Sequence, residues 1–533
     1  MDLTNPRYQG IREPVVAEGW NLQRLTPPSR LFGANGLRTG PDGRIYVAQV
    51  SGSQVSAVDV HSGLVETISP KGGEIVAPDD LVFDPEGNFY ATEITEGRVS
   101  MQAPNGKTRV ICGDLPCANP ITWYQGRLYA GECRAGGRIM ELDLNGGPPR
   151  ILLDNVMMPN AMEVGPDGKL YFPVMGTNEI WRIGLDGGEP EVVARDLGVP
   201  DAVKFDSKGQ IVSTQVASGQ VLRVNPADGS QTVLASLAPG LDNLTFVGER
   251  LFVSNINGQI DEVLAPGVTK QLVPEGFNCP LGIAMINDDE LFIADGPFAY
   301  TLRPGDKPQM AGMLFSPGYP GYSRGTASSA PGEVIVATAN GDVARFNPSG
   351  QKSEVIASGF DQLYGVVATP AGGVIAVEQG TGRVLGISPN GDVETLASGL
   401  NMPVGVALSN DGSCFVSESG AGRVVKLVGG KAETFVDGLR KPHGIVCQGS
   451  LLYIVDAEAK QLIEYDTESG RQRLVATDLP VGAPPGVVPK FLKAIGTMSG
   501  PMGPFSGIAS GADGTLYISA DAEGSVMALQ RET

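Results

Sequence analysis

The chain repeats one phrase about every 41 residues, and this period constrains the fold more than any other feature. Each copy reads as a turn, an apolar strand, a hairpin of the form (P/D)-(D/E)-G-x-(L/I)-Y-(V/F), and further alternating residues, as in NGLRTGPDGRIYVAQVSGSQVSAVD. Apolar and polar residues that alternate between turn signals predict short β-strands. A period of roughly 40–50 residues built from three or four such strands is typical of β-propeller blades.

Twelve copies are present, and a ring usually has about four to eight blades. We therefore expect an all-β chain of two tandem six-bladed β-propellers with twelve four-stranded blades. The length agrees, because 533 residues exceed what one hydrophobic core usually spans. The first residues of the twelve inner strands are Asn35, Asp79, Asn119, Asn160, Asp201, Asp242, Leu281, Arg324, Tyr364, Val404, His443 and Ser506.

The sixth and twelfth copies each stop after three strands, so each ring needs a fourth strand from elsewhere. Residues 20–26 (WNLQRLT) and 268–274 (VTKQLVP) precede the first and seventh copies and resemble the fourth strands of other copies. We expect each ring to close with its own leading strand, which would remove the exposed sheet edges. The predicted domains are residues 14–266 and 267–533.

One spacing is longer than the others, since 63 residues separate His443 from Ser506. This predicts an insertion at about 478–504, rich in Pro, Gly and Met, that lies over one face of the second ring. A functional lid and an ornamental loop both remain open.

Composition excludes several partners. A net charge of −20 repels nucleic-acid phosphates and anionic lipid surfaces. No apolar run reaches the roughly 20 residues of a membrane span, and MDLTNPRYQG does not resemble a signal peptide. We expect a cytoplasmic protein with reduced cysteines that acts on a small molecule, and self-association remains open.

The axial position of the first ring carries the chemistry. Equivalent residues of successive inner strands converge on a propeller axis, and here all six carry oxygen and three are aspartates. Confined carboxylates repel one another, and a hard divalent cation would relieve that repulsion. Oxygen donors without His or Cys favour Ca²⁺, although Mg²⁺ or Mn²⁺ could share the set. The predicted metal ligands are Asn35, Asp79, Asn160, Asp201 and Asp242.

Asp and Asn also favour turns before strands, which is the structural alternative for this column. That alternative predicts the same residue types in both rings. The second ring instead has Leu, Arg, Tyr, Val, His and Ser, which favours the cation site in the first ring.

The run of Asn119 (CANPITW), Asn160 (PNAMEVGPDGKLYF) and Asp201 (PDAVKFD) resembles the Asn, Asn, Asp order of a known family. That family is the senescence marker protein (regucalcin)/gluconolactonase group of six-bladed propellers, to which diisopropyl fluorophosphatase and the paraoxonases are related. The resemblance covers residues 14–266, and residues 267–533 share only the fold. One departure is that the family's first-blade Glu ligand is Asn35 here, so Asp79 or Asp242 is expected to replace its charge.

The resemblance implies a calcium-dependent hydrolase that acts on a lactone or related ester. It implies Asp201 and Asn119 as catalytic residues, with Asp201 as general base or, alternatively, as nucleophile. A histidine base is not expected, because His61 lies in an outer loop and His443 in the other ring. Glu93, Glu132 and Gln215 are candidate substrate-binding residues, and the two glutamates are alternatively acceptors for the Gly-rich turns that follow them.

The second ring offers an alternative site of Arg324, Tyr364, His443 and Ser506. These residues suit a metal-free anion pocket or a lyase or isomerase site, and KPHGIV resembles propeller lyases of the virginiamycin B type. A degenerate ring kept for stability or dimerisation, and a non-catalytic binding scaffold, are the other interpretations.

Overall fold

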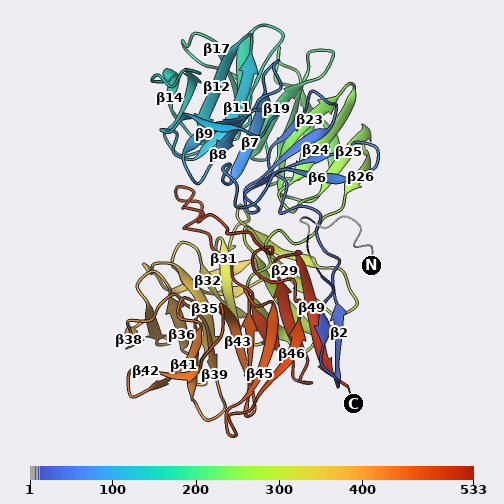
Figure 1. Cartoon of the computed structure of the whole chain (residues 1–533). Coiled ribbons are helices and arrows are strands. Elements are labelled where there is room, and N and C mark those ends of the chain that lie inside the picture. The colour runs from blue at the N-terminus through green and yellow to red at the C-terminus, as the bar shows by residue number, and fades with distance from the viewer. Residues whose placement is uncertain (1–6, 8–9, 11, 533) are drawn as a thin grey trace.

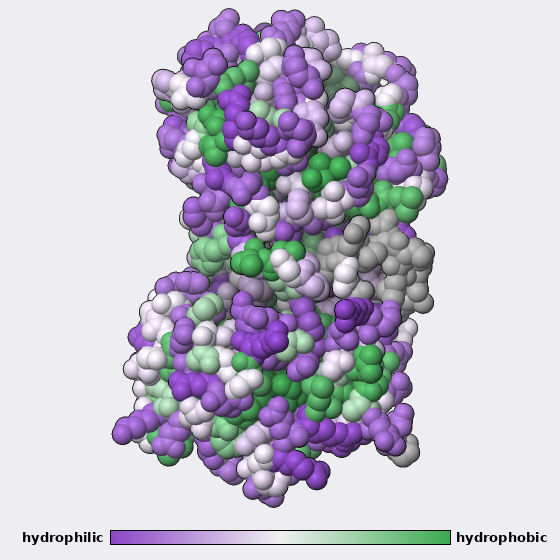
Figure 2. Space-filling model, in the orientation of Figure 1, coloured by the Kyte–Doolittle hydropathy of each residue, from purple (hydrophilic) through white to green (hydrophobic). Residues whose placement is uncertain are grey.

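The computed structural model describes residues 7, 10 and 12–532. They form 49 β-strands and one 3₁₀ turn, η1 (Met175–Thr177). Figure 1 shows two bodies stacked on each other, each built of sheets arranged around an axis. On the face that Figure 2 shows, the upper body is mainly hydrophilic, the lower body also carries hydrophobic residues, and a group of hydrophobic residues is visible at the waist between the two. None of the described residues belongs to a helix with the length and apolar character needed to cross a membrane.

The upper body is the first ring, and its six sheets each contain four antiparallel strands in chain order. The first two sheets are β3 (Leu37–Thr39), β4 (Ile45–Gln49), β5 (Gln54–Val58), β6 (Val65–Ser69), and β7 (Pro78–Phe83), β8 (Phe89–Glu93), β9 (Arg98–Gln102), β10 (Thr108–Cys112). The next two are β11 (Ala118–Tyr124), β12 (Arg127–Glu132), β13 (Gly137–Leu142), β14 (Arg150–Val156), and β15 (Glu163–Val164), β16 (Lys169–Val174), β17 (Glu179–Gly184), β18 (Glu191–Ala194). The last two are β19 (Pro200–Phe205), β20 (Ile211–Gln215), β21 (Gln220–Val224), β22 (Gln231–Ser236), and β23 (Leu241–Val247), β24 (Arg250–Asn255), β25 (Ile260–Ala265), β26 (Val268–Val273).

The lower body is the second ring. Its first three sheets are β27 (Ile283–Asn287), β28 (Glu290–Asp295), β29 (Phe298–Leu302), β30 (Gln309–Met313), then β31 (Ser323–Ser328), β32 (Val334–Thr338), β33 (Val343–Asn347), β34 (Lys352–Ala357), then β35 (Leu363–Ala368), β36 (Val374–Glu378), β37 (Arg383–Ile387), β38 (Val393–Ala397). The fourth and fifth are β39 (Pro403–Leu408), β40 (Cys414–Glu418), β41 (Arg423–Val428), β42 (Lys431–Val436), and β43 (Pro442–Gln448), β44 (Leu451–Asp456), β45 (Gln461–Asp466), β46 (Gln472–Thr477). The sixth has β47 (Ile508–Ser510), β48 (Leu516–Ala520) and β49 (Ser525–Arg531).

Hydroxyl groups on the second strand of several blades join neighbouring inner strands and show where each ring closes. Thr92 Oγ1 donates to the carbonyl of Asn119 in the next blade at 2.7 Å. Ser254 of the sixth blade donates in the same way to Asn35 of the first at 2.8 Å. Ser519 of the twelfth blade donates to Leu281 of the seventh. The predicted two rings of six blades are therefore confirmed.

The predicted closure of the rings is wrong. β26 pairs with β25 across the short Ala265↔Val268 hairpin, so residues 268–273 complete the sixth blade. β2 (Trp20–Arg24) pairs instead with β49 of the second ring, from Trp20↔Arg531 to Arg24↔Met527 (blue beside red in Figure 1). The local hairpin supplies the fourth strand of the sixth blade. The twelfth blade is the one that takes its fourth strand, β2, from a distant part of the chain. The predicted boundary at residue 266 therefore falls inside one sheet.

The N-terminal segment adds one more strand to the second ring. β1 (Val15–Val16) pairs with β46, from Val15↔Thr477 to Val16↔Ala476, so that sheet has five strands and the other eleven have four. The first two described strands, β1 and β2, therefore belong to the second ring. In sequence, the first ring lies between these two strands and the rest of the second ring.

The insertion lies between the two rings. It carries two isolated antiparallel bridges, Leu492↔Met502 and Ile495↔Ser499, which fold it back on itself. Lys493 reaches the first ring, where its Nζ forms an ion pair with Glu96 at 2.8 Å. The loop was expected to lie over one face of the second ring. It also contacts the first ring, so it lies between the two.

Candidate functional site

One cavity of about 110 Å³ lies on the axis of the first ring, on the side that faces the second ring. All six side chains of the oxygen-bearing column line it, and each is buried. They come from the start of the inner strand of six successive blades. These residues are Asn35, Asp79, Asn119, Asn160, Asp201 and Asp242.

A repeated backbone turn precedes each of these side chains. The residue two positions before every one of them has a left-handed φ. This conformation is costly for a β-branched residue such as Val199 and is retained where the surrounding structure enforces it. The six residues are Gly33 (φ 88°), Ala77 (46°), Cys117 (56°), Met158 (60°), Val199 (63°) and Gly240 (99°).

A β-bulge follows the turn in four of the blades. In β19 the register shifts between Pro200↔Gln215 and Val203↔Ser213, so Asp201 lies where the ladder is interrupted. The same shift follows Pro78, Ala118 and Leu241. Bulges redirect side chains out of the regular alternation, and here they accompany the axial residue in each of these four blades.

Burial and mutual repulsion dominate the electrostatics of the cavity. Burial, followed by the charges of Asp242 and the neighbouring aspartates, raises the pKa of Asp79 and of Asp201 well above the ordinary value. Burial raises the pKa of Asp242 to about 7, although a hydrogen bond from Asn35 opposes the rise. Three neighbouring carboxyl groups therefore resist ionisation together unless a cation compensates them.

Two hydrogen bonds cross between neighbouring blades inside the column. Asn160 Nδ2 donates to Asp201 Oδ2 at 2.9 Å, and Asn35 Nδ2 donates to Asp242 Oδ2 at 3.0 Å. The amide oxygens of the two asparagines accept backbone N–H groups, from Ala161 at 2.8 Å and from Val50 at 3.2 Å. Asn160 and Asn35 thus orient the carboxylates beside them.

A second polar layer lies next to the column and was missed by the sequence analysis. Asp80 is almost completely buried, and its Oδ2 has no hydrogen-bond partner among the described residues. Burial raises the pKa of Asp80, while the charges of Arg38 and Lys204 oppose that rise. Both bases also form ion pairs with Glu163, at 2.8 and 3.1 Å. In the sequence, the sign of this second layer was the second aspartate of PDDLVF, which is Asp80.

The Asn and Asp oxygens in the cavity are the type of ligand that a hard divalent cation prefers. Six Asn and Asp side chains line the cavity, with the hydroxyl groups of Ser51, Tyr322 and Ser499 and the thiol of Cys133 beside them, and no Lys, Arg or His is among its described lining residues. Within the described part of the chain, no three His, Cys, Asp or Glu side chains form a metal-binding group by themselves. A cation on this axis would therefore depend on asparagine oxygens as well as on carboxylates.

The roof of the cavity comes from distant segments and is mostly apolar. Pro297, Leu314, Phe315 and Tyr322 of the second ring, and Ile495, Met498, Ser499 and Met502 of the insertion, face the column. The sequence analysis did not assign any of these residues to the site. The Met and Pro content of the insertion was the only signal. The cavity therefore has a polar floor from one ring and an apolar cover from the other.

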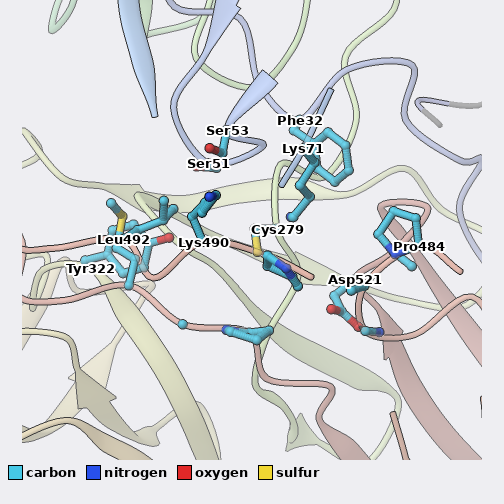
Figure 3. A pocket seen from close by; sticks show the side chains of 17 residues that line it. Phe32, Ser51, Ser53, Lys71, Cys279, Tyr322, Pro484, Lys490, Leu492 and Asp521 are labelled. Atoms are coloured by element: carbon cyan, nitrogen blue, oxygen red, sulfur yellow. The ribbon is translucent and has the colours of Figure 1, made fainter. Parts of the chain in front are cut away.

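A second pocket of about 60 Å³ lies beside the first, between the rings (Figure 3). Ser51, Tyr322 and Met502 line both cavities, so the two adjoin. Figure 3 shows Phe32 and Lys71 on one side of this pocket and Tyr322 and Asp521 on the other. It is the adjoining space through which a small molecule could approach the axial cavity.

The three predicted substrate-binding residues do not line either cavity. Glu93 accepts the Val76 N–H at 2.7 Å and pairs with Arg98 at 2.7 Å. Gln215 accepts the Gly198 N–H at 2.9 Å. Glu132 binds the guanidinium groups of Arg134 and Arg138. The positions of Glu93 and Glu132 match the structural alternative given for them, and Gln215 is held in the same way, because all three side chains accept backbone N–H groups of the turns.

The four candidates of the second ring are buried near its axis and away from the first-ring cavity. The guanidinium carbon of Arg324 lies 4.7 Å from the centre of the Tyr364 ring. The Ser506 N–H donates to His443 Nδ1 at 3.3 Å, and the Ser506 hydroxyl donates to Asp521 at 2.6 Å. Burial, together with Lys441 and Lys460, lowers the pKa of His443 to about 3, so this imidazole is neutral.

The comparisons with known proteins match part of the chain to one family model. Residues 18–257 match the family model of the SMP-30/Gluconolactonase/LRE-like region. The resemblance expected from the sequence is confirmed for that segment, which is slightly less than half of the chain. No curated protein matches the chain.

The chain is similar to several solved structures. A streptogramin B lyase is 18% identical with a TM-score of 0.39, covering 52% of this chain and 96% of its own. Virginiamycin B lyase from Staphylococcus aureus is 16% identical with a TM-score of 0.38, covering 55% and 98%. A candidate gluconolactonase is 17% identical with a TM-score of 0.38, covering 51% and 98%. At these values the similarities carry no information about chemistry.

Proposed function

We propose that the first ring is a metal-dependent hydrolase of a lactone or related ester, with its site in the axial cavity. One observation carries the proposal: six oxygen-bearing side chains, three of them buried carboxylates, converge from six blades on one cavity without a basic side chain. The family match of residues 18–257 supports a lactonase-type propeller.

Asn35, Asp79, Asn160, Asp201 and Asp242 would hold the cation. The all-oxygen set favours Ca²⁺, with Mg²⁺ or Mn²⁺ as alternatives. When bound, such an ion supplies Lewis acidity that polarises a carbonyl group. Its charge would also lower the pKa of the three aspartates, whose repulsion otherwise favours their protonated forms.

Asp201 is the proposed general base. Asn160 fixes its Oδ2 by the 2.9 Å hydrogen bond, which leaves Oδ1 to take a proton from the attacking water. Asn119 lies two blades away from Asp201, lines the same cavity and would orient the substrate carbonyl with its amide group. The apolar roof of Phe315, Met498 and Met502 limits the water that can reach the reacting carbonyl.

The first test is elemental analysis of the purified wild type and Asp201→Asn, together with rates on a panel of lactones and aryl esters. We expect about one divalent ion per chain and measurable hydrolysis in the wild type, with both reduced in the variant. A wild type that hydrolyses the panel without any bound or added metal would contradict the cation, and no turnover of any panel member would contradict the hydrolase.

A further inference from the structure

Arg324 is a fully buried cation on the axis of the second ring. It is 0% exposed, and one of its nitrogens, Nη1, donates to the Leu363 carbonyl at 3.0 Å. The other two, Nε and Nη2, have no hydrogen-bond partner among the described residues. A buried charge with unsatisfied donors is costly, and proteins compensate such groups with an opposite charge.

The two unsatisfied nitrogens form the edge of the guanidinium that this chain uses elsewhere for carboxylates. Arg98 Nε and Nη2 donate to the two oxygens of Glu93 at 2.9 and 2.7 Å. Arg127 binds Glu141 with the same two nitrogens at 2.9 and 2.8 Å. This planar fork matches the two oxygens of a carboxylate. Arg324 presents the same two nitrogens, and no carboxylate of the described residues binds them.

The surroundings of the fork favour an anion. None of the six axial positions of the second ring is a carboxylate, whereas the first ring has three. His443 accepts the Ser506 N–H at Nδ1, so its own proton lies on Nε2, where it is a donor. Tyr364 stacks near the guanidinium and brings a hydroxyl group. The first axis therefore carries three carboxylates, whereas the second carries one guanidinium and has a carboxylate, Asp521, bound to Ser506.

Residues close in sequence to the axial positions of the second ring line the pocket between the rings, which Figure 3 shows. Tyr322, two residues before Arg324, lines that pocket, and so do Lys71 and Lys490. Burial lowers the pKa of Lys71, and the charge of Arg7 adds to this shift. The pocket thus contains the basic Lys71 and Lys490 with Arg7 close by, and one carboxylate, Asp521; the basic residues would attract a small anion to the second ring.

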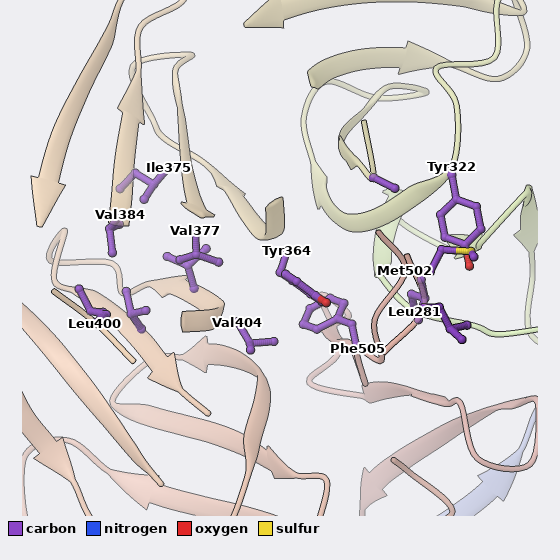
Figure 4. Close-up of a cluster of buried hydrophobic side chains, with 14 of the residues drawn as sticks. Leu281, Tyr322, Tyr364, Ile375, Val377, Val384, Leu400, Val404, Met502 and Phe505 are labelled. Carbon is purple, nitrogen blue, oxygen red and sulfur yellow. The ribbon is translucent and has the colours of Figure 1, made fainter. Parts of the chain in front are cut away.

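The end of the insertion covers the axis. Gly503 lines the pocket and lies directly on the Tyr364 hydroxyl, because a Cβ added at Gly503 would be 1.9 Å from that oxygen. The Phe505 ring packs edge-on against Tyr364, with centroids 6.3 Å apart (Figure 4). An anion would reach Arg324 when residues 502–505 move aside.

We propose that the axis of the second ring binds a small carboxylate anion on the Nε and Nη2 fork of Arg324, entered from the pocket between the rings. The site is separate from the cation column and does not depend on the hydrolase proposed above. Its ligand class is a monocarboxylate small enough to lie beside Tyr364.

The test uses the whole chain in a buffer free of carboxylates, with sodium acetate, sodium chloride and acetamide as probes. Acetamide is the neutral analogue of acetate, and chloride is an anion that lacks the paired oxygens. We expect acetate to raise the melting temperature saturably, by about 2–5 °C at one hundred times its Kd. Acetamide and chloride should give no saturable rise. An equal rise with acetamide, or a larger one with chloride, would overturn the proposal.

Arg324→Met and Arg324→Lys locate the site, with Arg303→Met as the matched control on an exposed blade edge of the same ring. Arg324→Met should melt no lower than the wild type without acetate, because it removes an uncompensated buried charge, and should lose the acetate response. Arg324→Lys keeps the positive charge but lacks the two paired nitrogens, so it should lose most of the acetate response. A full response in Arg324→Met would overturn the proposal. If neither variant folds, calorimetric titration of the wild type with acetate and acetamide decides, and no acetate binding refutes it.

Discussion

Asn160 and Asp201 are joined across two neighbouring blades by a 2.9 Å hydrogen bond from Nδ2 to Oδ2. The residues are 41 positions apart, one repeat of the sequence, and both follow a left-handed residue two positions earlier. The carboxylate is therefore held by the geometry of two turns and one amide. This arrangement suits a group that must present a chosen oxygen to the cavity.

Asp201→Asn should abolish the proposed chemistry without unfolding the ring. Loss of a general base typically lowers kcat by about 10²- to 10⁴-fold. The substitution also removes one of three repelling carboxyl groups, so the melting temperature of the metal-free protein should be unchanged or higher. Rates, bound metal and melting curves check this. Asp228→Asn, in an exposed turn between β21 and β22, is the control and should behave as the wild type. Wild-type rate and metal content in Asp201→Asn would refute the assignment.

The stability of the metal-free protein should fall as pH rises through the range set by the aspartates. The folded pKa of Asp242 is about 7, above its ordinary 3.8, so its protonated form is favoured by folding. Its contribution is complete below about pH 3.8 and is lost as pH rises to about 7. Asp79 and Asp201 act in the same direction.

Melting temperatures in EDTA and in Ca²⁺ between pH 5 and 7.5 measure this effect. Asp242→Asn should flatten the decline in EDTA, and Ca²⁺ should reduce or reverse it, because the cation binds the ionised carboxylates. A wild-type curve in EDTA with the same slope as that of Asp242→Asn would contradict the raised pKa.

The repeat predicted the blades and the axial column because both depend on local periodicity. Turn residues and alternation recur in every copy, so aligning the copies identifies the residues that share the axis. Closure of the rings was not predictable in the same way. WNLQRLT and VTKQLVP have similar strand patterns, and only the tight Ala265↔Val268 hairpin decides that the second pairs locally and the first pairs with the distant β49.

The roof of the cavity was not predictable either, since Met498 and Tyr322 reach the first-ring axis only through the stacking of the two rings. The role of Glu93, in contrast, is visible in the sequence. Acceptors 17 residues after the N–H that they bind recur in both rings, at Gln49, Glu93, Gln215, Asp295, Glu378 and Glu418. A column shared by both rings indicates a structural role.

Glu93→Gln should therefore reduce stability and leave the activity of the folded protein unchanged. The amide can still accept the Val76 N–H, but the paired hydrogen bonds with Arg98 are lost. Hydrogen bonds to charged groups contribute about 1.5–3 kcal/mol, which is the expected loss in the free energy of unfolding. Glu418→Gln in the second ring is the matched variant and should cost a similar amount, measured by urea unfolding. Lower kcat with unchanged stability in Glu93→Gln would restore a substrate-binding role.

The apolar roof should select the substrate. Met498→Gln keeps the length of the side chain and adds a polar group opposite the aspartate column. A lost apolar contact costs about 1 kcal/mol, so kcat/KM for an alkyl-substituted lactone should fall about fivefold, with little change for the unsubstituted ring. Met101→Gln, in β9 and outside both cavities, is the control. Equal losses for both substrates would indicate that Met498 does not contact the alkyl group.

Trp20→Ala tests the swapped closure. Trp20 is buried in β2, where its ring packs edge-on against Tyr453 of the second ring with centroids 6.1 Å apart. Removing a buried tryptophan typically costs about 3–5 kcal/mol. Because β2 completes the twelfth blade and not the first, the loss should appear in the second ring. Limited proteolysis should then cut within residues 274–532 first, while the first ring stays intact. Early cleavage within residues 30–273, with the second ring intact, would show that the chain closes its first ring with this strand after all.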